Sequence, residues 1–177
     1  MATWVALLHS VTLGPGRRLR SEDLRDLADA LRFSGPRTVL STGNLIFGAD
    51  GGEVVLAQRM EAGIALRWGR AIPVLLRRAE DWHDLVAANP FPVQSREDPA
   101  GVAVRVMREE PAAARLAEIA ACCRPGEGFA ATPRALWVAT ADAAAGSPLL
   151  RAMAAARSGI GTFRNASAIA KIAAALD

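Results

Sequence analysis

The sequence predicts an α+β fold made of two halves, each with the element order β-α-β-β-α-β. Three observations lead to this prediction. Short apolar runs rich in strand formers alternate with longer segments of helical periodicity. The same order of segments occurs in residues 1–78 and again in residues 101–177. Apolar residues make up 51% of the 177 residues, which is enough to bury a sizeable core.

The first half opens with an apolar strand over residues 4–11 and a glycine-rich loop over residues 13–18. Leucines at helical spacing, with acidic residues in the first turn, predict a helix over residues 21–32 capped by Ser21. The remaining apolar segments predict strands over 38–40 and 45–47, a helix over 54–68 and a strand over 72–76.

The second half is joined to the first by residues 79–100, in which we expect a helix and then a polar surface loop over 93–100. Its elements follow the same order, with strands over 101–107, 129–132, 136–140 and 162–163, and helices over 111–123, 149–157 and 166–176. This order is typical of ferredoxin-like folds, so we predict two ferredoxin-like subdomains with extra helices.

The first strand is apolar on both faces. Trp4, Ala6 and Leu8 point to one side, and Val5 and Leu7 to the other. A sheet with two apolar faces is usually covered on both. We therefore expect helices on one face, and the second half or a second copy of the chain, as a homodimer, on the other.

Several classes of protein are excluded by composition. We find neither an uninterrupted apolar run of about 18 residues nor a basic segment before the apolar N-terminus, so we expect no membrane span and no signal peptide. The only cysteines are the adjacent Cys122 and Cys123, without metal or redox spacing. We therefore predict a cytoplasmic protein with free thiols, no metal and no cofactor.

The charge is concentrated in the first half. Residues 1–78 contain 11 basic and 7 acidic side chains, a net charge of +4, whereas the rest contains 10 and 11, a net charge of −1. An anionic partner, either a small molecule or nucleic acid, should therefore prefer the first half.

One edge of the first sheet is predicted to gather polar groups. The topology places the end of the first strand beside the glycine-rich loop and the turn at residues 41–44. Arg17 and Arg18 supply positive charge, the following helix adds its N-terminal dipole, and the glycines expose backbone N–H groups. The candidate ligand-binding residues here are Arg17, Arg18, Ser41, Gly43 and Asn44. The alternative interpretation is a glycine-rich loop with solvated arginines beside an ordinary turn.

Three further residues are candidates. His9 ends the first strand and is the one candidate for proton transfer, although no nucleophile–base arrangement is recognisable around it. Near the end of the chain, Arg164 is a candidate for reaching an anion. Asn165 is either a second ligand-binding residue or the cap of the closing helix.

Several segments together match a known pattern: the strand at residues 4–8, the helix at 24–33, Ser41-Thr42-Gly43-Asn44, Asn89-Pro90-Phe91-Pro92 and Arg164-Asn165. With these segments the chain resembles, over nearly its whole length, the bacterial family known as domain of unknown function 1697. The resemblance implies two ferredoxin-like subdomains but no activity, because the family has no settled function.

The chain departs from the family pattern at polar positions. His9, Ser10 and Thr12 stand where the resemblance implies Arg, Gly and Asn. Pro148 replaces an expected Lys, and Ala166 replaces an expected Trp. If the family has a site at these positions, this chain has changed or lost it.

Three functions are consistent with these observations. The leading hypothesis is a non-catalytic binding protein for an anionic ligand or nucleic acid. The second is an enzyme acting on a small phosphorylated or carboxylated substrate, with Arg17, Arg18 and Arg164 binding the substrate and His9 transferring a proton. The third is a structural module that dimerises through the second face of the sheet.

Overall fold

The computed structural model describes residues 1–41, 43–140 and 147–177. It is a mixed α/β structure in which every pairing between the described strands is antiparallel. The chain forms two compact units: unit 1 comprises Met1–His83 and Lys171–Asp177, and unit 2 comprises Asp84–Ala170. The predicted division into subdomains at 1–78 and 101–177 stays a prediction.

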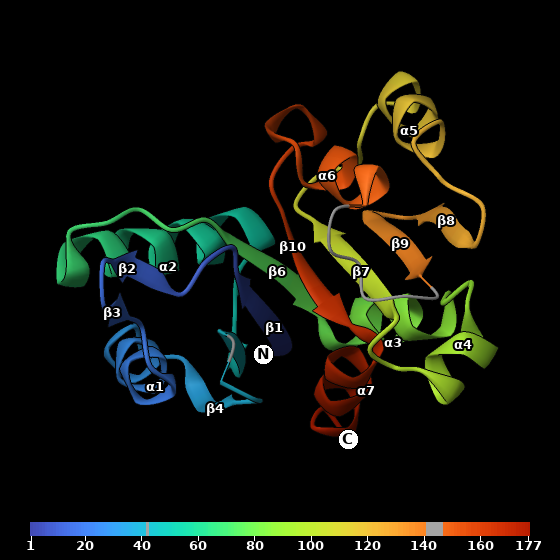
Figure 1. Ribbon diagram of the computed structural model, residues 1–177. Coiled ribbons are helices and arrows are strands. Elements are labelled where there is room, and N and C mark those ends of the chain that lie inside the picture. The colour runs from blue at the N-terminus through green and yellow to red at the C-terminus, as the bar shows by residue number, and fades with distance from the viewer. Residues whose placement is uncertain (42, 141–146) are drawn as a thin grey trace. The chain divides into compact units, whose positions relative to one another are not determined.

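The sheet of unit 1 has the strand order β4-β5-β1-β6. Three of these strands, β1, β4 and β6, are labelled in Figure 1. The elements of this part of the chain are β1 Ala2–Leu8, β2 Thr12–Gly14, β3 Arg17–Arg18, α1 Ser21–Ala30, β4 Ser34–Thr38, β5 Asn44–Ala49, α2 Glu53–Trp68, β6 Val74–Arg78 and α3 Ala79–Ala87. The short strands β2 and β3 form a separate ribbon. Since β1 and β4 both run antiparallel to β5, they run parallel to each other.

The core of unit 1 lies between this sheet and helices α1 and α2. Trp4, Ala6 and Leu8 belong to it, as the alternation along β1 predicts. Leu27 of α1 packs directly on α2 at Gly63, where a Cβ atom would lie 2.7 Å from Leu27 Cδ1. Val5 and Leu7, on the opposite face of β1, are buried as well.

The C-terminal segment 171–177 is tied to the rest of unit 1 by polar contacts. Arg37 Nη2 donates a hydrogen bond of 2.6 Å to the carbonyl oxygen of Ala175. His83 Nε2 lies 3.6 Å from a carboxylate oxygen of Asp177. Unit 1 is therefore built from two stretches of the chain that are separated by the whole of unit 2.

The sheet of unit 2 has the strand order β10-β7-β9-β8. Helices α5 and α6 contribute Ile119, Leu149 and Met153 to a core with Leu136 and Val138 of the sheet. The elements from Pro92 onward are α4 Pro92–Glu97, β7 Val102–Met107, α5 Ala113–Ala120, β8 Glu127–Thr132, β9 Ala135–Thr140, α6 Pro148–Ala154, a short 3-10 helix Ala156–Ser158, β10 Gly161–Asn165 and α7 Ala166–Ala174.

Several predicted elements differ from the structure. The strand predicted over residues 4–11 ends at Leu8, and the loop predicted over 13–18 contains β3 and the end of β2. The strand predicted at 38–40 lies earlier, at β4, because Leu40 adopts a left-handed φ of 62° that turns the chain. Pro36 is tolerated within β4 because β4 is an edge strand. The loop predicted over 93–100 contains α4, which Pro92 opens from a first-turn position that suits proline. The N-cap of α1 is Arg20 rather than Ser21.

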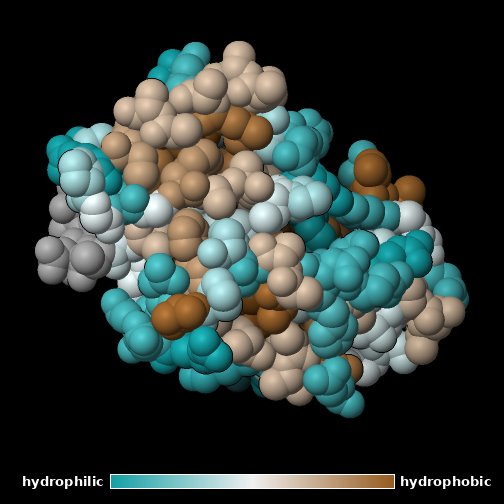
Figure 2. Space-filling model, turned by 90° about the vertical axis from the view of Figure 1, so that its right-hand side faces the viewer, coloured by the Kyte–Doolittle hydropathy of each residue, from teal (hydrophilic) through white to brown (hydrophobic). Residues whose placement is uncertain are grey.

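Within the described residues, no helix combines the length and apolar character needed to cross a membrane. On the face shown in Figure 2, apolar residues form a continuous area across the upper part of the view, and hydrophilic residues predominate at the right and along the lower edge. Apolar atoms normally contribute a large share of the surface of a folded protein. Cys122 and Cys123, just after α5, are free thiols.

Candidate functional site

The end of β1 and the turn between β4 and β5 lie at one edge of the unit 1 sheet, as predicted. The backbone N–H of Leu8 donates a hydrogen bond of 3.0 Å to the carbonyl oxygen of Gly43. Gly43 has a φ of 74°, and a Cβ atom there would lie 2.7 Å from Val11 Cγ1. A glycine is needed here because the backbone is left-handed and because the chain from β1 passes close to it.

Asn44 is held inside the protein. Its side chain donates a hydrogen bond of 2.9 Å from Nδ2 to the carbonyl oxygen of Val39, and the residue is 1% exposed. Asn44 therefore closes the turn between β4 and β5. Ser41 is exposed at the same turn, whereas its neighbour Thr42 lies outside the described residues.

His9 and Ser10 follow β1 at this edge. His9 is exposed, and its backbone N–H donates a hydrogen bond of 2.9 Å to the carbonyl oxygen of Pro73, just before β6. The hydroxyl oxygen of Ser10 accepts a hydrogen bond of 3.0 Å from the backbone N–H of Thr12. These contacts shape the connection from β1 to the β2–β3 ribbon. A role for His9 in proton transfer stays a prediction.

Arg17 and Arg18 form β3, where they pair with Gly14 and Thr12 of β2. Both residues are exposed. Neither guanidinium has an ion-pair or hydrogen-bond partner among the described residues. The β2–β3 ribbon therefore presents two adjacent, uncompensated positive charges.

The N-terminus of α1 carries an acidic capping box, and its contribution to anion binding stays a prediction. Asp23 Oδ2 accepts a hydrogen bond of 2.8 Å from the backbone N–H of Arg20, the N-cap residue. The Arg20 guanidinium is in turn 2.6 Å from Glu22 Oε1. The acidic first turn already satisfies the helix dipole.

Arg164 and Asn165 lie at the end of β10, in unit 2. Arg164 is 8% exposed and donates hydrogen bonds to Thr162 Oγ1 (2.9 Å) and to the carbonyl oxygen of Phe163 (2.7 Å). Burial lowers the pKa of Arg164 to about 10. Asn165 Oδ1 accepts a hydrogen bond of 2.9 Å from the backbone N–H of Ala168. Asn165 therefore caps α7, which is one of the two roles that the sequence left open.

The predicted residues thus fall into two groups. His9, Ser41, Gly43 and Asn44 meet at one edge of unit 1, close in sequence to the ribbon with Arg17 and Arg18. Arg164 and Asn165 belong to unit 2. A joint site of the two groups stays a prediction.

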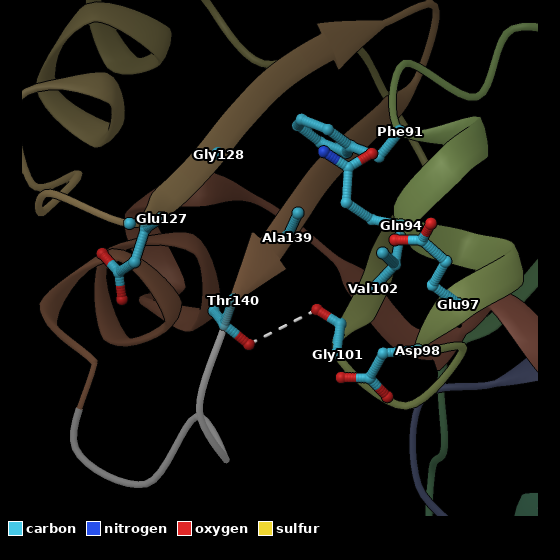
Figure 3. A pocket seen from close by; sticks show the side chains of 11 residues that line it. Phe91, Gln94, Glu97, Asp98, Gly101, Val102, Glu127, Gly128, Ala139 and Thr140 are labelled. Atoms are coloured by element: carbon cyan, nitrogen blue, oxygen red, sulfur yellow. Dashed lines mark hydrogen bonds between the residues drawn. The ribbon is translucent and has the colours of Figure 1, made fainter.

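A pocket of about 470 Å³ in unit 2 was not predicted (Figure 3). It lies between α4 and the strands β7, β8 and β9, with Glu97 and Asp98 on the α4 side and Glu127 and Thr140 across from them. Its volume is within the range typical of small-molecule sites. Thr140 Oγ1 is 3.3 Å from the carbonyl oxygen of Gly101, which ties β9 to the start of β7.

Phe91 forms one wall of the pocket because Gly128 leaves room for its ring. A Cβ atom at Gly128 would lie 2.7 Å from Phe91 Cε1, closer than any real contact. The ring is positioned by Asn89, whose Oδ1 accepts a hydrogen bond of 2.9 Å from the Phe91 backbone N–H. Asn89 Nδ2 donates to Ser95 Oγ at 2.9 Å, which fixes the same asparagine to α4.

The charged residues that line the pocket, within the described part of the chain, are all acidic: Glu97, Asp98 and Glu127. Glu127 accepts hydrogen bonds from Ser147 Oγ at 2.6 Å and from the backbone N–H of Arg124 at 2.9 Å. The Ser147 hydrogen bond is the largest cause of a lowered Glu127 pKa, so this carboxyl is ionised at neutral pH. In residues 1–41, 43–140 and 147–177, no three acidic, His or Cys side chains are arranged to hold a metal ion.

The pocket was missed because its walls come from four separate segments of the chain. The only sequence signal was Asn89-Pro90-Phe91-Pro92, one of the motifs that carried the family resemblance. The structure shows that this motif positions Phe91 in the pocket wall.

The fold and these sites define the class: a mixed α/β protein built from two antiparallel four-stranded sheets. Over residues 1–137 the sequence matches the family described as "Protein of unknown function (DUF1697)", and the chain belongs to this family. The resemblance seen in the motifs is thereby confirmed.

The structure is similar to that of a conserved bacterial protein from Streptococcus pneumoniae. The TM-score is 0.77 at 16% sequence identity, and the similarity covers 99% of each chain. At this identity the comparison shows the fold alone. No curated protein matches the sequence.

Proposed function

We propose that this chain is a non-catalytic binding protein that contacts the phosphate backbone of nucleic acid, or a comparable polyanion, through the β2–β3 ribbon. The observation that carries the proposal is the pair of exposed guanidinium groups at Arg17 and Arg18, which lack carboxylate partners among the described residues. The net charge of +4 over residues 1–78 supports the same partner.

The ribbon geometry favours an extended polyanion over a small anion. Successive side chains of a strand point to opposite faces, so Arg17 and Arg18 do not converge on one phosphate group. A polymer with regularly spaced phosphates offers each guanidinium a separate contact. Such contacts confer affinity without sequence specificity, because they leave the base edges unread.

The experiment measures binding of a labelled DNA duplex and a labelled single-stranded RNA between about 50 and 200 mM salt. Each phosphate contact contributes a slope of about −0.9 to the plot of log K against log salt for duplex DNA. The double variant Arg17→Ala/Arg18→Ala should therefore lose about 2 from the magnitude of this slope.

The matched control is Arg70→Ala/Arg151→Ala, which removes the same charge at exposed positions outside the ribbon. It should keep the wild-type slope, since a non-contacting charge releases no counterions. Equal slopes for the two double variants would refute the role of the ribbon. Flat titrations with both polynucleotides at the lowest salt would overturn the proposed function.

The proposal extends to architecture and setting. We infer that each unit is a ferredoxin-like fold, which the strand orders β4-β5-β1-β6 and β10-β7-β9-β8 support. We further propose a cytoplasmic location, in keeping with the free thiols of Cys122 and Cys123. A homodimer stays a prediction from the sequence, and light scattering tests it.

A further inference from the structure

We infer that the pocket of unit 2 binds a small organic cation, whose flat or apolar body lies against Phe91 and whose positive group faces Glu97 and Asp98. This inference goes beyond the proposed function, because it concerns a different site and a ligand of opposite charge. It rests on the shape of the pocket, on its aromatic wall and on the sign of its charge.

The shape of the pocket is built into the backbone. Gly128 on β8 leaves the space that the Phe91 ring occupies. At Gly101, a Cβ atom would lie 2.8 Å from the Thr140 carbonyl oxygen, so the chain entering β7 also passes too close for a side chain. These two glycines let α4 approach the strands while a volume of about 470 Å³ stays open between them.

The aromatic wall favours a cation or a flat apolar group. Phe91 is half-buried, and its ring borders the pocket (Figure 3). The face of an aromatic ring attracts ammonium and guanidinium groups, and it offers apolar contact to a ring of the ligand. Gln94, exposed on α4 beside the ring, can donate or accept a hydrogen bond.

The charge of the lining decides the sign of the ligand. Glu97, Asp98 and Glu127 line the pocket, and in the described chain no Arg or Lys lines it with them. The whole protein carries a formal net charge of +3, so this concentration of negative charge is local. A partly enclosed cleft of one sign raises the local concentration of ligands of the opposite sign.

Three probes of nearly the same shape test the inference on the isotope-labelled full chain by NMR: benzylammonium, benzyl alcohol and benzoate. We expect saturable shifts for benzylammonium, at the amides of Gly101, Gly128 and Thr140. Benzyl alcohol should bind several-fold more weakly, and benzoate should not bind. Equal affinity of benzylammonium and benzyl alcohol, or shifts centred elsewhere, would overturn the inference.

The variant Glu97→Gln/Asp98→Asn keeps the shape of the pocket but removes two charges. Each exposed carboxylate should account for roughly a two- to fivefold change in affinity, so the pair should weaken benzylammonium binding by about four- to 25-fold. The matched control, Asp26→Asn/Asp29→Asn on the exposed face of α1, should bind benzylammonium as the wild type does. Unchanged affinity in the pocket variant would refute the inference.

A second variant tests the aromatic wall. Phe91→Leu should weaken benzylammonium binding, with an unchanged thermal transition showing that the fold persists. Unchanged binding by this variant would remove Phe91 from the site and contradict the inference as stated. The Arg17→Ala/Arg18→Ala variant should bind benzylammonium normally, so failure of the polyanion proposal and failure of this one are distinguishable.

Discussion

The effect of Gly63→Ala on the free energy of unfolding of unit 1 should depend on the residue at position 27. The substitution should be neutral or destabilising in the wild type, and stabilising in the Leu27→Ala background. Gly63 lies in the interior of α2, where alanine is favoured over glycine by about 1 kcal/mol. In the wild type this gain is opposed, because the new Cβ atom would lie 2.7 Å from Leu27 Cδ1. Carbon atoms in good contact are about 3.5–4.0 Å apart, so Leu27 must move by roughly 1 Å.

The magnitudes follow from these distances. Overpacking of a core typically costs about 1–3 kcal/mol, so Gly63→Ala alone should be neutral or destabilise by up to about 2 kcal/mol. Leu27 is 2% exposed, and Leu27→Ala should cost about 2–5 kcal/mol. In that background the clash is gone, and Gly63→Ala should stabilise by about 1 kcal/mol. The coupling free energy between the two positions is therefore about 1–3 kcal/mol.

The assay is urea unfolding of the wild type, the two single variants and the double variant. Tryptophan fluorescence reports mainly on unit 1, since Trp4, Trp68 and Trp82 belong to it and only Trp137 belongs to unit 2. Far-ultraviolet circular dichroism follows both units. If the two substitutions are additive within about 0.5 kcal/mol, the reasoning from the close approach of α1 and α2 is wrong.

Two further predictions concern unit 2. Asn165→Ala should destabilise α7 by about 1 kcal/mol, because the backbone N–H of Ala168 loses its hydrogen-bond acceptor. Asn165→Asp should retain this cap. A thermal unfolding transition that is unchanged by Asn165→Ala would contradict the role of Asn165. The Glu127 pKa lies below its ordinary value of 4.5, so the carboxylate stabilises the fold above that value and this contribution is lost as the pH falls through the lowered pKa. Glu127→Gln should therefore flatten the acid side of the stability profile, and parallel profiles for variant and wild type would count against the Ser147 contact.

Local patterns predicted the elements of the fold well. Alternation along β1 assigned Trp4, Ala6 and Leu8 to one face, and the core of unit 1 contains these three residues. The predicted meeting of the β1 end with the turn at Gly43 is also observed. The face assignment follows from the two-residue period of a strand. The meeting with Gly43 follows from the direction of the strands in the predicted sheet topology.

The fate of individual polar side chains was less predictable, because it depends on contacts between distant segments. Asn44 and Arg164 are as polar in sequence as Arg17, yet both are buried and make hydrogen bonds inside the protein. The sequence predicts Asp23 as a favourable charge in the first turn of α1, and the structure adds that its side chain accepts a hydrogen bond from the backbone N–H of Arg20. Residue type alone does not determine whether a polar side chain is buried or which hydrogen-bond partner it takes.

The pocket of unit 2 shows the same limit more strongly. In sequence, Gly101 opens a predicted strand and Gly128 directly precedes one. Only their close approaches to Thr140 and Phe91 show what the two glycines do. The polar composition of residues 93–100 predicts a loop, but residues 93–97 belong to α4, a helix without buried residues, so its polar side chains reveal no helical periodicity.

The assembly of unit 1 from two distant stretches has a consequence for synthesis. While a ribosome is translating residues 84–170, the first sheet and its helices can already collapse, but residues 171–177 do not yet exist. Arg37 then has no Ala175 carbonyl to donate to, and His83 has no Asp177 beside it. The part of the chain made first is thus completed last, after the intervening unit has emerged.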